Sequence, residues 1–322
     1  MIHVLRPALA AALVVASGFS AAAGYPDRPI RLLVPQAPGS ASDTVARIMA
    51  AELAPLLGQQ IVVDNRPGGA LTLGIELMVR AAPDGYTLAY APVGALAIGP
   101  NMMAKPPYDV NRDLQAVAHI ASNQMLLVVS PKLPFKTVQE VIDYAKANPG
   151  KLSNASSGNG SPGHVGFELF KVMTGTNIVH IPYKGGAAAL TDLISGQVHL
   201  MLESQNSITP QAKAGRVRGL AVSGSQRSTA LPELPTIAEA GVPGYEATTW
   251  NGIIAPAGVP KAIIARLNAD INKALAAPST RDKLAAIGAE PVGGTPAQFA
   301  ALIKSEHAKW ADVIKRTGAK VD

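Results

Sequence analysis

Short apolar runs rich in β-branched residues alternate along this chain with longer segments in which apolar residues recur at helical spacing. The first such series predicts strands at 30–35, 60–64 and 86–90, separated by helices at 42–57 and 71–82. Ser42 or Asp43 is expected near the start of the first helix, and Gly58 follows its end. Together these elements make one βαβαβ unit, which is typical of α/β proteins with parallel strands.

A second series of the same kind follows, and the C-terminal part returns to one strand and two helices. The capping box Thr137–Glu140 predicts one helix start, and Thr295 with Pro296 and Gln298 predicts another. The remaining expected strands are 124–130, 152–155, 178–181, 198–202, 217–222 and 247–254, and the remaining helices begin at Pro162 and Ala187 or cover 260–276 and 295–316. No segment resembles a disordered linker, so we expect two lobes joined by strands, with a single large sheet as the alternative.

The N-terminus has the pattern of a cleavable export signal. Arg6 supplies a positive charge, residues 7–19 are mostly apolar, and Ala21 and Ala23 fit the small-residue cleavage pattern. The apolar run is shorter than the roughly 20 residues that a spanning helix needs, although a retained anchor is the alternative. We therefore predict that residues 1–23 are a signal peptide and that the mature protein is periplasmic.

Composition narrows the possible functions. The chain has 48% hydrophobic and 16% charged residues, as expected for a well-packed globular protein, and no cysteine, which excludes disulfides and thiolate sites. Removal of Arg6 with the signal would lower the net charge from +6 to +5. Because the basic residues are scattered and not interleaved with aromatics, nucleic-acid binding is not indicated.

Two glycine-bearing loops each follow an expected strand and open an expected helix. They span residues 38–43 and 156–164. A helix start exposes unpaired backbone N–H groups and about half a positive charge, and Ser hydroxyls add donors. Both loops belong at the carboxyl ends of strands, where ligands of open α/β sheets lie, so together they could grip a small carboxylate. Alternatively they are ordinary turns in which Asp43 and Ser161 cap helices.

Other chemistry is less well supported. Gly158, Gly160 and Gly163 spell a dinucleotide fingerprint, but the following strand ends without the acidic residue that would bind a ribose. Ser161, His164 and Asp192 could be imagined as a hydrolase triad, although the nucleophile-elbow motif is missing. The histidines form no pair at metal-binding spacing, so no metal site is expected. No cofactor is expected either.

Several motifs resemble one known family in order along the mature chain. They are the opening segment V34-P-Q-A-P-G-S-A-S-D-T-V-A-R47, and the blocks at 64–69, 83–88, 180–186, 231–241 and 243–246. The chain is similar to the Bug-type (TctC-like) substrate-binding proteins of tripartite tricarboxylate transporters.

The resemblance implies a two-lobed periplasmic-binding-protein fold (type II, Venus-flytrap), each lobe a mostly parallel sheet flanked by helices. Lobe 1 would comprise residues 25–123 and 247–322, and lobe 2 residues 124–246. The resemblance also implies a ligand-binding set on both sides of a cleft: Gly39, Ser40, Ala41 and Asp43 facing Ser157, Gly158, Asn159, Gly160, Ser161 and His164, with Val93, Lys184, Ser204 and Gln205 in the walls.

The chain departs from the family pattern at three places. Gln36 stands for the usual Phe, Ser40 for the second Gly of the first loop, and residues 203–205 read Glu-Ser-Gln where an Asp-containing stretch is commoner. Because these changes add polar groups to the expected cleft, we hypothesise a ligand richer in hydrogen-bonding groups than is usual for the family.

The resulting expectation is a monomeric, non-enzymatic receptor for a small carboxylate. Dicarboxylates, tricarboxylates, acidic amino acids and aromatic carboxylates such as nicotinate all remain open. The resemblance implies that the closed receptor docks on the permease subunits of a tripartite tricarboxylate transporter or signals to a sensor kinase. The alternative is an exported hydrolase that uses Ser161 and His164.

Overall fold

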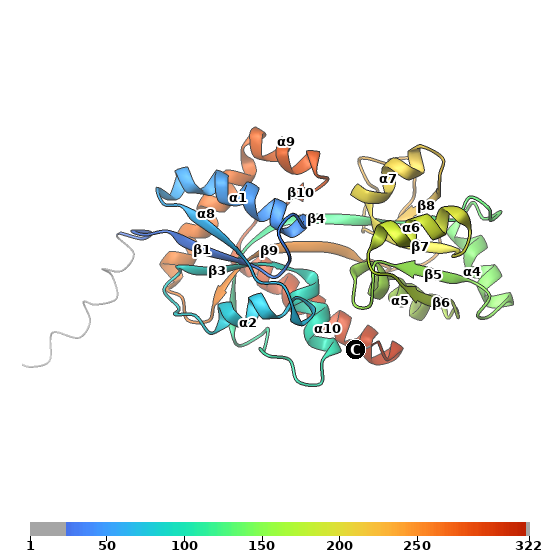
Figure 1. The fold of residues 1–322 in the computed structure, drawn as a ribbon, viewed down its shortest axis with the longest axis horizontal. Coiled ribbons are helices and arrows are strands. Elements are labelled where there is room, and N and C mark those ends of the chain that lie inside the picture. The colour runs from blue at the N-terminus through green and yellow to red at the C-terminus, as the bar shows by residue number, and fades with distance from the viewer. Residues whose placement is uncertain (1–23, 320–322) are drawn as a thin grey trace, which may run out of the picture.

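Two curved sheets share one long strand, β4 (Leu114–Val129), in the computed structural model, which describes residues 24–319. Figure 1 shows the two halves side by side, with β4 and β9 (Thr248–Pro256) running from one to the other. The α/β two-lobed fold is therefore confirmed. The predicted signal peptide, residues 1–23, lies outside the described residues.

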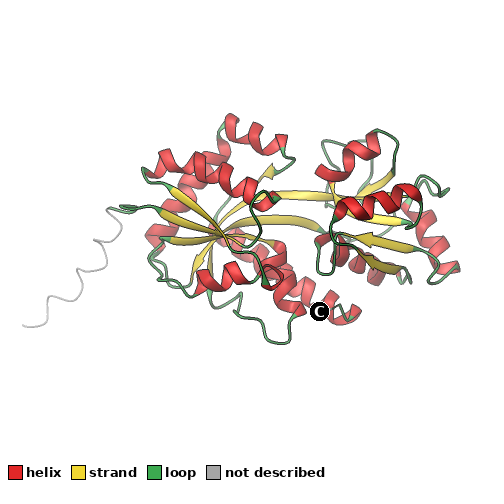
Figure 2. Ribbon diagram, in the orientation of Figure 1, coloured by secondary structure: helices red, strands yellow, loops and turns green. Residues whose placement is uncertain are grey.

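The first half carries the βαβαβ unit. Strands β1 (Ile30–Val34), β2 (Ile61–Asn65) and β3 (Thr87–Pro92) are parallel, whereas β9 is antiparallel to β3 and to β4. Helices cover the faces of this sheet (Figure 2). They are α1 (Ala41–Leu57), α2 (Leu73–Val79), α8 (Lys261–Ala276), α9 (Pro278–Ala286) and α10 (Pro296–Thr317), with shorter turns at Gly69–Leu71, Gly94–Ile98 and Gly99–Met102 (α3) and a two-residue strand β10 (Glu290–Pro291).

The second half repeats the arrangement. Strands β5 (Ser153–Ser156), β6 (Val179–Pro182) and β7 (Leu200–Ser204) are parallel, whereas β4 pairs antiparallel with β7 and with β8 (Arg218–Val222). Its helices are α4 (Val138–Ala147), α5 (Pro162–Thr174), α6 (Gly186–Ser195) and α7 (Gln205–Lys213). The expected mostly parallel character thus holds for the strands of the βα units, while the strands that join the halves make each sheet mixed.

Strand β4 changes partners in its middle. Residues up to Gln124 pair with β9, and from Met125 onward the strand pairs with β7 and β8. The sequence predicted only the second part of this strand, at 124–130. The observed strand begins ten residues earlier, at Leu114, because its first part pairs with β9. The added residues include Ala116, Ile120 and Ala121, which are buried but show no simple alternation because the strand is covered on both faces.

The helix starts follow the predicted capping chemistry. Thr137 and Thr295 both form complete capping boxes, with Glu140 and Gln298 respectively, as the sequence predicted. The first helix differs, because its N-cap is Ser40 and not Ser42 or Asp43. Ser40 Oγ accepts from the Asp43 amide at 3.2 Å, so the helix begins at Ala41 and its first turn reaches into the glycine-bearing loop.

One buried apolar cluster contains residues from both halves, including Ala89 of β3 and Phe167 of α5. Helix α10 contributes Trp310 and Ile314 to this cluster and passes beneath the strands that join the halves (Figure 1). Each half also has a cluster of its own, one beneath α1 and α8 and one beneath α6 and α7. The halves are therefore joined by packing along one side and not by two strands alone.

Candidate functional site

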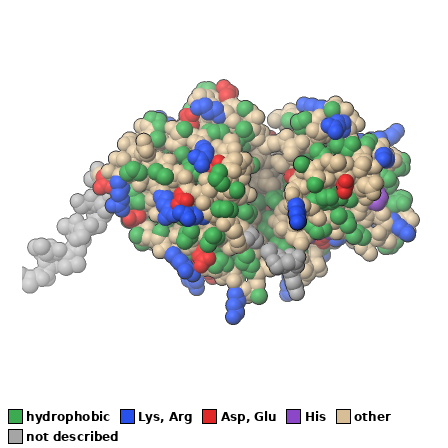
Figure 3. Space-filling model, viewed as in Figure 1, with side chains coloured by type: hydrophobic (Ala, Val, Ile, Leu, Met, Phe, Trp, Pro, Cys, Tyr) green, Lys and Arg blue, Asp and Glu red, His purple; other side chains and the backbone are tan. Residues whose placement is uncertain are grey.

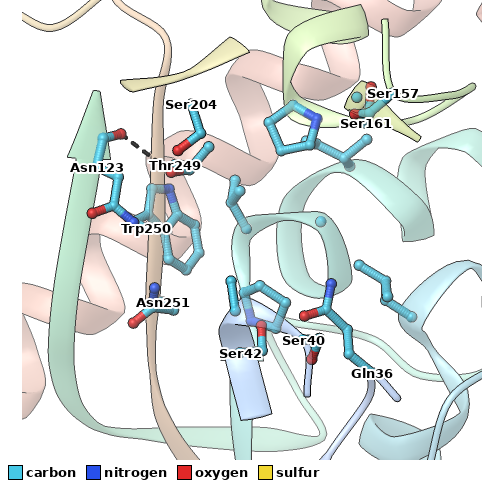
Figure 4. Close-up of a pocket in the computed structure, with 18 of the residues that line it drawn as sticks. Gln36, Ser40, Ser42, Asn123, Ser157, Ser161, Ser204, Thr249, Trp250 and Asn251 are labelled. Carbon is cyan, nitrogen blue, oxygen red and sulfur yellow. Dashed lines mark hydrogen bonds between the residues drawn. The ribbon is translucent and has the colours of Figure 1, made fainter. Parts of the chain in front are cut away.

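A cavity of about 960 Å³ lies between the two sheets. It is within the usual size of small-molecule sites. Figure 3 shows the hollow between the halves, and Figure 4 shows Gln36 and Ser40 from the first half across from Ser157 and Ser161 from the second. The lining combines small apolar side chains and backbone with Ser, Thr, Asn and Gln side chains.

The first loop is held in shape from behind by Asp43. Its carboxylate accepts from the Gly39 amide at 2.8 Å, from Asn65 Nδ2 at 2.9 Å and from Arg47 Nε at 3.0 Å. Asn65 Nδ2 also donates to the carbonyl of Gln36 at 2.9 Å. The hydrogen bond from Arg47 is the main reason why the pKa of Asp43 falls to about 2. Asp43 thus orients the loop, and the cavity side of the loop is formed by Ser40, Ala41 and Ser42.

The second loop faces the first across the cavity. Ser161 is the N-cap of α5 and accepts from the His164 amide at 3.3 Å, with Pro162 at the first helical position. Gly158 and Gly160 have positive φ angles of 137° and 73°, and a Cβ at Gly160 would lie 3.3 Å from Met102 Sδ of the other half. Glycine is therefore required where this loop approaches the opposite lobe.

Two stacked histidines support the second loop. His164 Nδ1 accepts from the Gly160 amide at 3.1 Å, and its ring lies 3.9 Å from the ring of His180, nearly parallel to it. His180 Nε2 in turn lies 2.7 Å from Ser156 Oγ. Burial is the main cause that lowers the pKa of His164 to about 3 and that of His180 to about 4, so both rings are neutral at neutral pH.

Nine of the fourteen residues predicted to bind ligand line the cavity: Ser40, Ala41, Val93, Ser157, Gly158, Asn159, Gly160, Ser161 and Ser204. Five do not line it. Gly39 is an exposed residue of the first loop, and Lys184 is also exposed. Asp43 and His164 are buried behind the cavity surface of the loops, and Gln205 is buried with its Oε1 accepting from Ser228 Oγ at 2.9 Å. The other walls include Gln36 and Glu203, two of the departures from the family pattern, and residues that the sequence did not single out.

The missed residues come mainly from the strands that join the halves. Thr249, Trp250 and Asn251 of β9 form one wall with Asn123 of β4, and the Thr249 hydroxyl donates to the Asn123 carbonyl at 3.2 Å (Figure 4). The Trp250 indole N–H donates to the buried carboxylate of Glu306 at 3.2 Å. A run of Thr-Trp-Asn inside an otherwise apolar strand was the available signal.

The lining that the structure describes contains no Lys, Arg or His. Its one acidic side chain is Glu203, whose pKa is raised by burial. An anion in this cavity would therefore be held by amide dipoles and hydroxyl groups, and not by a cationic side chain. This is the chemistry that helix starts provide.

The imagined hydrolase triad is not assembled. The His164 ring accepts from a backbone amide, the Ser161 hydroxyl caps α5, and Asp192 accepts from the Tyr183 hydroxyl at 2.6 Å. Within residues 24–319, no group of three or more His, Asp or Glu side chains is placed to hold a metal ion.

Comparisons with known proteins agree with this geometry. The profile of the family described as "Tripartite tricarboxylate transporter family receptor" matches residues 45–319. BugT of Bordetella pertussis is 39% identical over 92% of this chain and 91% of its own length. Two solved structures superimpose well. R. palustris Rpa4515 with adipate is 39% identical over 92% of this chain and 100% of that chain, with a TM-score of 0.78. MatC from Rhodopseudomonas palustris with bound malate is 32% identical over 90% of this chain and 100% of that chain, with a TM-score of 0.75. The chain belongs to the TctC family of tripartite tricarboxylate transporter receptors.

Proposed function

We propose that this protein is a periplasmic receptor that captures a small carboxylate between its two lobes and delivers it to a membrane transporter. One observation carries the proposal: the start of α1 and the loop at the start of α5, which belong to different sheets, line the same cavity. The exposed N–H groups and the positive end of each helix favour a negative charge between them.

The chemistry of the relatives supports a carboxylate. One similar structure contains adipate and another contains malate, both dicarboxylates. Ser157 adds a hydroxyl that makes no hydrogen bond with any described residue, while Val93, Met102 and Trp250 provide apolar surface for a short carbon chain. Preorganised donors reduce the entropy lost on binding, so a small ligand could be held without a cationic side chain.

The lobes in this proposal are residues 25–123 with 247–322, and residues 124–246. Closure would bend β4 and β9 where they pass between the sheets, a hinge motion of the kind that periplasmic binding proteins use. The proposed ligand contacts are the cavity-lining residues of both loops, with Val93 and Ser204.

Transport requires export and a partner. The predicted signal peptide at residues 1–23 would place the protein in the periplasm, and none of the helices that the structure describes has the length and hydrophobicity to cross a bilayer. The family description points to the permease subunits of a tripartite tricarboxylate transporter as the docking partner, with a sensor kinase as the second candidate. We propose that the receptor acts as a monomer.

A thermal-shift screen followed by calorimetry with adipate, malate, succinate and citrate tests the proposal. A ligand at 100 times its dissociation constant should stabilise the fold by about 2.7 kcal/mol. Ser157→Leu should abolish this effect because the larger side chain would fill the cavity beside the second loop.

Ser225→Leu is the matched control, since Ser225 is exposed in the same half. Equal ligand responses in the two variants, or chemical turnover of the bound carboxylate detected by mass spectrometry, would refute the receptor.

A further inference from the structure

Glu203, near the carboxyl end of β7, is one of the residues that line the cavity, and one of its carboxylate oxygens is buried without a partner. Its Oε1 accepts from the Ser204 amide at 2.9 Å, while Oε2 is buried and has no hydrogen-bond partner. The side chain points to the start of α6, where a Cβ at Gly186 would lie 3.1 Å from Oε2. Glycine at this position leaves the carboxyl group room beside the cavity.

In the described part of the chain no cationic side chain neutralises Glu203. It forms no ion pair with any residue between 24 and 319, and the cavity lining in that range contains no Lys, Arg or His. Lys184 is close in sequence to Gly186 but is exposed and does not line the cavity. A buried carboxylate without a partner is unfavourable, so a positive charge on a bound ligand would be stabilised here.

The other unsatisfied groups of the cavity are of the same kind. Among the described residues that line it, the buried side-chain atoms without a partner are Tyr90 Oη, Asn251 Oδ1 and Glu203 Oε2, all of them oxygens. Carbonyl and carboxylate oxygens accept hydrogen bonds, and a phenolic oxygen can do so. The side chains around the cavity thus leave buried acceptors without a donor, in addition to the donors at the two helix starts.

We propose that the ligand is a carboxylate that also carries a protonated amino group, and that Glu203 binds this group while the helix starts bind the carboxylate. The inference rests on the proposed receptor function and narrows its ligand class. An unsubstituted dicarboxylate would bring two negative charges and no positive charge to offset the Glu203 carboxylate. Such a ligand would bind well only if Glu203 were protonated and donated a hydrogen bond. In that case wild type would bind the unsubstituted dicarboxylate most tightly, which the experiment below detects.

The test is a calorimetric titration at pH 7.5 with matched probes, after bound ligand has been removed by unfolding and refolding. Succinate, glutarate and adipate are compared with L-aspartate, L-glutamate and L-2-aminoadipate, and with 3-aminopropanoate, 4-aminobutanoate and 5-aminopentanoate. We expect at least one amino-bearing probe to bind ten times more tightly than the dicarboxylate of the same length.

Glu203→Gln keeps the shape of the side chain and removes its charge. We expect it to weaken the preferred amino-bearing probe at least tenfold and to leave the parent dicarboxylate unchanged or more tightly bound. Glu233→Gln, an exposed change of the same kind in the same half, should alter neither. Glu203→Ala serves in place of Glu203→Gln if the latter does not fold, as judged by its thermal unfolding without ligand.

The outcomes distinguish this inference from the receptor function. If wild type binds an unsubstituted dicarboxylate most tightly, or if Glu203→Gln weakens both probe classes equally, the inference is wrong while the receptor stands. If no probe binds to wild type at millimolar concentration, both are wrong.

Discussion

Replacing Asp43 by Asn should destabilise the protein in a way that depends on pH. In the native structure the Asp43 carboxylate accepts hydrogen bonds from Gly39, Asn65 and Arg47, and its pKa is lowered from 3.8 to about 2. A shift of this size corresponds to at most about 2.4 kcal/mol, at about 1.36 kcal/mol per pKa unit. Because the Arg47 side chain is 53% exposed, screening by water reduces the expected loss to about 1–2 kcal/mol.

The sign of the pH dependence follows from the lowered pKa. The stabilisation is complete above the unfolded-state value of 3.8 and disappears as the pH falls through about 2. Urea unfolding of wild type and Asp43→Asn should therefore differ by about 1–2 kcal/mol at pH 7, and by about half as much near pH 3.

Asp282→Asn is the control, because Asp282 is an exposed acid on α9. A difference between Asp43→Asn and wild type that stays constant from pH 7 to pH 3, or that is no larger than the effect of the control, would refute the assigned role of Asp43. The same variant should also bind carboxylates more weakly, because Asp43 holds the amide of Gly39 in the first loop.

Three further substitutions test other parts of the account. Gly252→Ala should lower the free energy of unfolding by about 1–3 kcal/mol, since its Cβ would lie 2.5 Å from the Ala118 carbonyl oxygen; unchanged chemical denaturation would contradict this. Thr295→Ala removes an N-cap and should cost about 1 kcal/mol by the same measurement, with ligand affinity unaffected. His164→Ala leaves the Gly160 amide without its acceptor, so calorimetry should show carboxylate affinity reduced about tenfold, a loss of about 1.4 kcal/mol; full affinity would show that the ring does not support the loop.

Most of the helices and strands could be predicted from short sequence patterns. Capping residues such as Thr137 and Thr295 act within one turn, so their helices could be placed from sequence. Helices α7 and α9 were not predicted; α7 contains Pro210, and α9 has apolar residues too sparse to show helical spacing. The full length of β4 could not be predicted because its burial on both faces removes the alternation of a surface strand.

The candidate site was predicted in its loops and missed in its walls. Glycine and serine before a helix mark the start of α1 and the loop before α5 without any knowledge of tertiary structure. Trp250 and Asn251 face the cavity only because β9 crosses between the sheets, which no local pattern specifies. Lys184 was predicted to line the cavity because its loop leads to it. The side chain is instead exposed to solvent, and no local pattern in the sequence specifies that direction.

The central claim is that one carboxylate is held by the start of α1 and by the loop before α5 at the same time. An NMR titration of the ¹⁵N-labelled protein with the tightest-binding carboxylate follows the amides of Ala41 and Ser42 in one lobe and those of Ser157 and Gly158 in the other. The account predicts that all four amide signals change together and give one dissociation constant. Changes confined to one pair, or two different dissociation constants, would contradict it.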